Sequence, residues 1–125
     1  MKRKRILIVE DEASLQNAMQ EFLIAEGFDV LLASDGDIAV RMAKKELPDL
    51  ILLDIMLPKK DGFEVLMELV MDEKTEMIPK ILLTNLENME DIGKAFSLGV
   101  STYLVKSNYK LGEIVVKIKE TLKMS

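Results

Sequence analysis

The chain has 125 residues, the usual length of one domain, and we expect residues 1–125 to form a single domain. Hydrophobic residues make up 49% and charged residues 31%, which allows a packed core and argues against disorder. There is no cysteine and no histidine, which excludes disulfides, thiolate metal sites, a cysteine nucleophile, the commonest general base and the usual zinc ligand.

The net charge of −5 is unevenly distributed. Residues 2–5 are all basic and we expect them at the surface, residues 106–123 carry five lysines, and the part between is strongly acidic. This distribution argues against direct binding of nucleic acid. The longest apolar runs are too short to span a bilayer, and the basic N-terminus lacks the apolar segment of a secretory signal. We therefore expect a cytoplasmic protein without membrane insertion.

Apolar runs and helical periodicity alternate along the chain. Five short runs predict strands at Ile6–Val9, Val30–Ala33, Leu50–Leu53, Ile81–Leu83 and Tyr103–Val105. Apolar stripes predict helices over Glu12–Glu26, Asp35–Glu46, Gly62–Met71, a short stretch around Ile92–Phe96 that stops near Gly99, and Leu111–Leu122. The alternation predicts an α/β fold of (βα)5 type, a doubly wound parallel sheet with helices on both faces.

Polar residues follow four of the predicted strands. Glu10, Asp11 and Glu12 follow the first strand, and Asp54 follows the third. Thr84 ends the fourth strand and Lys106 ends the fifth. In an open parallel sheet the carboxyl ends of the strands share one edge, where ligands bind. We therefore expect carboxylates, a hydroxyl and an ammonium group to converge at this edge.

Several of these residues have simpler interpretations. Asp11 is equally consistent with a cap of the first helix, Thr84 with a strand end, and Lys106 with a solvated surface lysine. Asp54 is harder to explain this way, because Ile55–Pro58 follows it and is not a helix that it could cap.

The acidic residues predict a cation site. Two like charges about 4 Å apart cost on the order of 4 kcal/mol at an effective dielectric constant of about 20. Bringing Asp54 close to Glu10 and Asp11 therefore requires a compensating cation, and Lys106 supplies only one charge. An all-oxygen ligand set without histidine or cysteine favours Mg²⁺ or Mn²⁺.

Four segments carry a resemblance to a known family. They are ILIVEDE (Ile6–Glu12), LILLDIMLPKKDG (Leu50–Gly62), ILLT (Ile81–Thr84) and YLVK (Tyr103–Lys106). In order and spacing they resemble a chemotaxis-type response-regulator receiver domain, the phosphoacceptor module of two-component signalling. The resemblance covers nearly the whole chain and implies a flavodoxin-like sheet with strand order 2-1-3-4-5.

The resemblance also implies a role for each residue. Asp54 would accept a phosphoryl group from a partner histidine kinase or histidine phosphotransfer protein. Asp11, Asp54 and the backbone carbonyl of Met56 would bind Mg²⁺, with help from Glu10. Thr84 would hydrogen-bond the phosphoryl group and Lys106 would pair with it. Tyr103 would be an aromatic switch that turns inward when Thr84 moves.

The output of such a switch would be a changed interaction surface. The resemblance places it on the fourth helix, fifth strand and fifth helix. Its target would be a downstream protein or an output domain absent from this chain. A domain of this kind is a signalling phosphoacceptor and not an enzyme, with self-phosphorylation and autodephosphorylation as its only reactions.

The sequence departs from the family pattern at two positions. Ser107 follows Lys106, where the family usually has proline in a cis bond, and a cis bond to a non-proline residue costs roughly 3–4 kcal/mol. We therefore expect a trans bond and a reshaped turn. Asn85 replaces the usual small residue after Thr84. It could narrow access for the phosphodonor, or its amide could bind the phosphoryl group.

A third feature concerns the stability of an aspartyl phosphate. Met56 and Leu86 lie near the expected phosphoryl site and offer no side chain to orient an attacking water. We therefore expect the phosphorylated state to be long-lived.

Other functions fit the sequence less well. The alternative within the same family is an atypical receiver that acts as a phosphorylation-independent interaction module. Nucleotide- or flavin-binding enzymes are disfavoured because the chain has no G-x-G-x-x-G or G-x-x-x-x-G-K-[ST] motif. A phosphatase with an aspartyl intermediate would need a second acid two residues after Asp54, where Met56 stands.

Overall fold

A computed structural model describes residues 3–85, 89–108 and 110–124 of the protein. Its elements, in chain order, are β1 (Arg5–Val9), α1 (Ala13–Ala25), β2 (Asp29–Ala33), α2 (Gly36–Glu46), β3 (Leu50–Leu53), α3 (Gly62–Val70), β4 (Lys80–Thr84), α4 (Met89–Ser97), β5 (Val100–Val105), a 3-10 turn (Lys106–Asn108) and α5 (Leu111–Thr121). The strands form one parallel sheet in the order β2-β1-β3-β4-β5, which confirms the predicted fold. No helix in the described ranges has the length and apolar character needed to span a bilayer.

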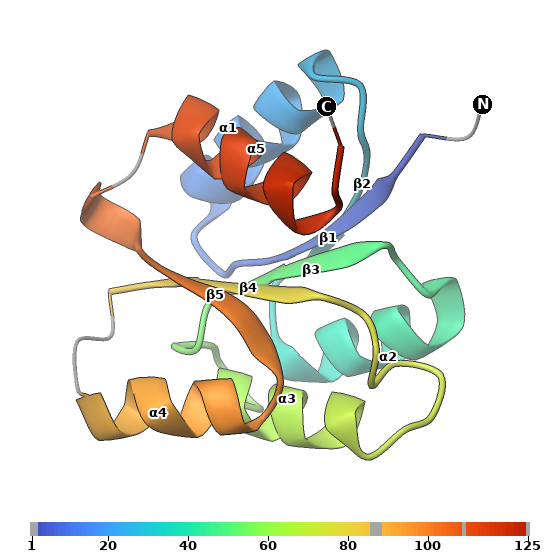
Figure 1. The fold of residues 1–125 in the computed structure, drawn as a ribbon, viewed down its shortest axis with the longest axis vertical. Coiled ribbons are helices and arrows are strands. Elements are labelled where there is room, and N and C mark those ends of the chain that lie inside the picture. The colour runs from blue at the N-terminus through green and yellow to red at the C-terminus, as the bar shows by residue number, and fades with distance from the viewer. Residues whose placement is uncertain (1–2, 86–88, 109, 125) are drawn as a thin grey trace.

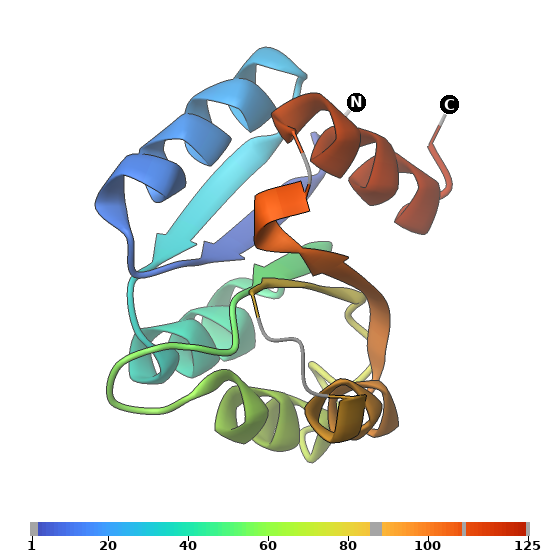
Figure 2. The ribbon, with the colours of Figure 1, turned by 90° about the vertical axis from the view of Figure 1, so that its left-hand side faces the viewer.

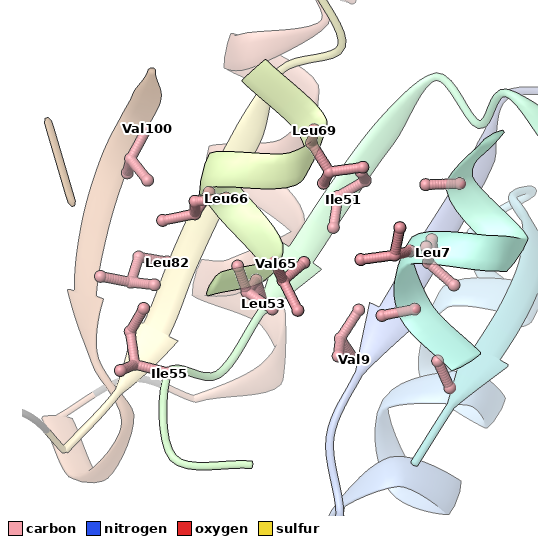
Figure 3. Close-up of a cluster of buried hydrophobic side chains, with 14 of the residues drawn as sticks. Leu7, Val9, Ile51, Leu53, Ile55, Val65, Leu66, Leu69, Leu82 and Val100 are labelled. Atoms are coloured by element: carbon pink, nitrogen blue, oxygen red, sulfur yellow. The ribbon is translucent and has the colours of Figure 1, made fainter. Parts of the chain in front are cut away.

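Helices cover both faces of the sheet (Figure 1). The sheet therefore separates two hydrophobic layers. Side chains alternate across a strand, so Leu7 and Val9 of β1 pack with α2 and α3, whereas Ile6 and Ile8 pack with α1 and α5. Figure 3 shows the first layer, in which Leu66 and Leu69 of α3 lie over β3 and β4. Burial on both faces explains why Ile6–Val9 of β1 and Leu50–Leu53 of β3 are continuous apolar runs.

Four strands are longer than predicted: β1 and β2 each begin one residue earlier, and β4 and β5 differ by more. β5 begins at Val100 and not at Tyr103, because an edge strand has one strand neighbour and tolerates the exposed Ser101. β4 begins at Lys80, whose side chain is fully buried. The Lys80 ammonium donates to the carbonyl oxygens of Thr75 and Glu76, at 3.4 and 3.1 Å. These hydrogen bonds compensate the charged group while the aliphatic part of the side chain packs on the core. Burial lowers the pKa of Lys80.

Local capping sets the helix boundaries close to the predicted ones. The Asp35 and Asp61 carboxylates accept hydrogen bonds from the Ile38 and Glu64 amides and thereby cap α2 and α3. Leu47 ends α2 in the left-handed conformation, with φ of 46°, directly before Pro48.

The loop from β3 to α3 packs tightly against the start of α2. A Cβ atom on Gly36 would overlap the backbone carbonyl oxygen of Lys60 in this loop. A Cβ on Gly62 would lie 2.7 Å from the Ile55 Cδ1 atom and 2.9 Å from the Asp54 carbonyl oxygen. These two glycines allow the backbone after Asp54 to lie close to the rest of the fold.

We expect Gly36→Ala to lower the free energy of unfolding by about 2 kcal/mol, because the added methyl group meets a backbone atom that cannot rotate away. Urea unfolding followed by circular dichroism measures this. The matched control is Gly93→Ala in α4, where the Cβ has open space and alanine favours the helix. Equal stability of the Gly36→Ala variant and the wild type would contradict the close packing of this loop.

Candidate functional site

The carboxyl ends of the strands bring the predicted site residues to one edge of the sheet. Figure 2 turns this edge toward the viewer. The register pairs Val9 with Leu53, so Glu10 and Asp54 follow at the ends of adjacent strands. Thr84 pairs with Val105, the residue before Lys106. The convergence expected from the sequence is therefore present.

Three carboxylates form the centre of this site. Glu10 and Asp54 are buried, with 2% and 5% of their surface exposed, whereas Asp11 is exposed. One carboxylate oxygen from each of the three lies within 4.8 Å of the others. Asp11 does not cap the first helix, because the N-cap residue of α1 is Glu12 and its side chain makes no capping bond.

Lys106 links two of these carboxylates. Its Nζ lies 2.6 Å from Asp54 Oδ2 and 2.7 Å from Glu10 Oε1. The Lys106 side chain is 16% exposed, so it is not a solvated surface lysine. Burial lowers the pKa of Lys106, but the hydrogen bonds from its ammonium to Asp54 and Glu10 outweigh burial and raise it overall. The ammonium is therefore charged at neutral pH and compensates part of the buried negative charge.

Backbone hydrogen bonds orient both buried carboxylates. Asp54 Oδ1 accepts from the Met56 amide at 3.0 Å, so its two oxygens face different partners. Glu10 Oε2 accepts from the Glu12 amide at 3.0 Å. Burial raises the pKa of Glu10 above its usual value, and it outweighs the opposing effects of Lys106 and the Glu12 amide. Ionised Glu10 therefore costs folding free energy.

The remaining predicted residues occupy the same edge of the sheet. Thr84 is fully buried at the end of β4. Tyr103 is partly buried and packs against the hydrophobic layer beneath α2 and α3. Met56 lies just after Asp54 with 64% of its surface exposed. Leu86, the other apolar residue expected near the phosphoryl site, lies outside the described residues.

The two departures from the family pattern meet in the structure. The described residues contain no cis peptide bond, and Lys106–Asn108 form a 3-10 turn, as expected for the reshaped connection. Asn85 Oδ1 accepts a hydrogen bond from the Ser107 amide at 3.1 Å. This contact was not predicted from the sequence, although a residue other than proline after Lys106 supplies the required N–H.

Gln16 is a further residue that the sequence analysis missed. From the first turn of α1 its amide nitrogen donates to the Glu10 carbonyl oxygen at 3.0 Å and approaches that of Ala33 at 3.5 Å. It therefore fixes the backbone from which Glu10 projects. A polar residue near the start of an amphipathic helix gave no signal of this role, because such residues usually face solvent.

Comparison with known proteins gives consistent matches over nearly the whole chain. A family model described as the response regulator receiver domain matches residues 6–119. The transcriptional regulatory protein CiaR of Streptococcus pneumoniae is 41% identical over 97% of this chain and 52% of its own length. The alkaline phosphatase synthesis transcriptional regulatory protein PhoP of Bacillus subtilis is 38% identical over 98% of this chain and 50% of its own. This chain thus spans about half the length of these curated relatives.

A solved structure matches the whole fold. It is the receiver domain of sensor histidine kinase PA1611 from Pseudomonas aeruginosa, described with a magnesium ion coordinated in the active site cleft. It has a TM-score of 0.88 and 30% identity, and the match covers 98% of this chain and 99% of that one.

The raised pKa of Glu10 predicts a pH-dependent stability difference. Wild-type protein should become more stable relative to Glu10→Gln as the pH falls from about 7 to below 4.5. The folded protein binds a proton at Glu10 at a higher pH than the unfolded chain does, and glutamine cannot titrate. Urea unfolding at a series of pH values, with a chelator present, measures the difference. Glu113→Gln on α5 controls for the loss of one exposed charge, and a difference independent of pH would refute this prediction.

Proposed function

The chain belongs to the response regulator receiver family of two-component systems, and we propose that it is a phosphorylation-dependent switch with Asp54 as phosphoacceptor. Domains of this family are signalling phosphoacceptors rather than enzymes. The observation that carries the proposal is the position of Asp54 at the centre of the site. One of its oxygens pairs with the Lys106 ammonium and the other accepts from the Met56 amide, with Glu10 and Asp11 alongside.

Asp54 is chemically suited to this role without a general base. A carboxylate oxygen can attack phosphorus without a base to remove a proton first, so the absence of histidine from the chain is no obstacle. An Asp54 oxygen would form the new O–P bond as the P–N bond of a phosphohistidine breaks. The electron pair of that bond stays on the donor imidazole, which takes up a proton. The phosphohistidine must belong to a partner, a histidine kinase or histidine phosphotransfer protein.

The three carboxylates fit a divalent metal ion. Their oxygens approach one another within 4.8 Å, and hard oxygen donors without histidine or cysteine suit Mg²⁺ or Mn²⁺. Asp11 and Asp54 would hold the ion with the Met56 carbonyl oxygen, and Glu10 would assist. When bound, the ion neutralises negative charge on the transferring phosphoryl group.

Lys106 and Thr84 would hold the phosphoryl group after transfer. Phosphorylation adds a group of charge near −2 with three acceptor oxygens. Lys106 already contacts the acceptor carboxylate, and the Thr84 hydroxyl would donate to the new group. Tyr103, two residues before Val105 on the neighbouring strand, would turn inward as Thr84 moves. The changed surface would comprise α4, β5 and α5 and would bind a downstream protein or an output domain.

Incubation with acetyl phosphate and Mg²⁺ should add one phosphoryl group to the wild-type protein and none to Asp54→Asn, because the amide lacks the nucleophilic oxygen. Intact-protein mass spectrometry measures the adduct, and a chelator should abolish it. Asp29→Asn is the matched control, because Asp29 is exposed at the opposite end of the sheet.

Absence of an adduct from the wild-type protein would overturn the phosphoacceptor assignment. It would favour the alternative of a phosphorylation-independent interaction module. Beryllofluoride with Mg²⁺ gives a second measurement, since the switch predicts amide chemical-shift changes over α4, β5 and α5 that Asp54→Asn abolishes.

The aspartyl phosphate should be long-lived, and Met56→Gln should shorten its lifetime several-fold. The Met56 side chain is exposed beside Asp54 and cannot orient water, whereas an amide can. Loss of label after removal of the phosphodonor, with Mg²⁺ present, gives the rate. Met67→Gln, an exposed position on α3, should leave it unchanged. Rapid loss from the wild type would contradict the prediction.

A further inference from the structure

One hydrogen bond joins the two loops that follow β4 and β5. Asn85, the residue after Thr84, accepts from the backbone amide of Ser107, the residue after Lys106, at 3.1 Å. Both ends of this bond are therefore one residue from a group expected to hold the phosphoryl. The two strands that carry these groups are neighbours, with Thr84 paired to Val105.

The bond depends on both departures from the family pattern. A proline after Lys106 has no amide hydrogen to donate, and a glycine or alanine after Thr84 has no side-chain acceptor. Ser107 provides the donor through its backbone and Asn85 provides the acceptor through its amide oxygen. The two residues that depart from the family pattern therefore bond to each other in this chain.

The turn held by this bond carries Lys106. The 3-10 turn begins at Lys106. The Lys106 ammonium lies 2.6 Å from Asp54 Oδ2 and 2.7 Å from Glu10 Oε1. The four-carbon stem of lysine has a limited reach, so its ammonium can contact both oxygens only while the backbone of the turn stays within that reach. β5 is an edge strand and, among the described residues, pairs with β4 alone. The Asn85 bond extends that attachment past the last pair.

We propose that Asn85 is a positioning residue, which acts through Ser107 to hold the Lys106 ammonium between Asp54 and Glu10. This inference rests on the proposed phosphoacceptor function for its consequence, although the positioning itself requires no phosphoryl group. It differs from the two roles considered from the sequence, a gate for the phosphodonor or a direct ligand of the phosphoryl group. In this proposal the Asn85 side-chain oxygen accepts from the Ser107 backbone amide and does not bind the phosphoryl group.

The test uses Asn85→Leu, because leucine has the same number and branching of side-chain heavy atoms as asparagine but accepts no hydrogen bond. The variant therefore keeps a branched side chain at position 85 but loses the hydrogen bond to the Ser107 amide. Ser107→Ala is the matched control, since it keeps the backbone amide that donates the bond and removes only the hydroxyl.

Two measurements read the positioning directly. In Asn85→Leu we expect several-fold faster hydrogen exchange of the Ser107 amide and a lower ¹⁵N order parameter of the Lys106 ammonium. Ser107→Ala should match the wild type in the order parameter. An unchanged Lys106 order parameter in Asn85→Leu would overturn the proposal, even if the Ser107 amide exchanges faster.

A third measurement reads the consequence for phosphoryl transfer. Phosphorylation by acetyl phosphate with Mg²⁺ should be about fivefold slower in Asn85→Leu than in the wild type, the size expected for one lost hydrogen bond. An unchanged or faster rate would overturn the proposal. A slower rate with an ordered Lys106 would assign Asn85 to direct contact with the phosphoryl group and would also overturn it. If the wild type accepts no phosphoryl group, the proposed function fails, and the exchange and order measurements still decide the positioning.

Discussion

The Lys106 ammonium between two buried carboxylates is the interaction on which the rest of the site depends. Glu10 and Asp54 follow the ends of adjacent strands and both are buried. Their charges therefore repel in a medium of low dielectric constant. Lys106 contacts both at hydrogen-bond distance but adds only one positive charge. With Asp11 nearby, the site keeps an excess of negative charge. That excess suits the edge of the sheet to a further cation. The raised pKa of Glu10 comes mainly from burial, and the neighbouring Asp54 charge adds a smaller contribution.

Rigid surroundings hold the Asp54 carboxylate in place. Asp54 donates its own amide to the Val9 carbonyl oxygen and accepts from the Met56 amide, so the backbone on both sides fixes its orientation. The following loop packs so closely that Gly36 and Gly62 leave no space for a Cβ atom. Close packing of this kind holds a charged side chain in one orientation before any ligand binds.

The loops after β4 and β5 differ from the family pattern, and the structure gives the two differences one physical explanation. Ser107 restores a backbone donor that proline lacks, and Asn85 supplies its acceptor. Substitutions that look unrelated in the sequence, 22 residues apart, therefore meet across neighbouring strands. A receiver domain can thus fix the turn after its lysine through a side chain on the adjacent loop.

The sequence alone determined the sheet, its helices and the identity of the residues at its edge, because apolar runs and helical apolar stripes are local signals. It also indicated that Glu10, Asp11, Asp54 and Lys106 would meet, since parallel strands end at a common edge. Tertiary structure alone decided which oxygen Lys106 contacts, how Gln16 supports the backbone of Glu10, and where the edge strand β5 begins. These depend on distances between segments remote in sequence, and no local pattern of residues encodes such distances.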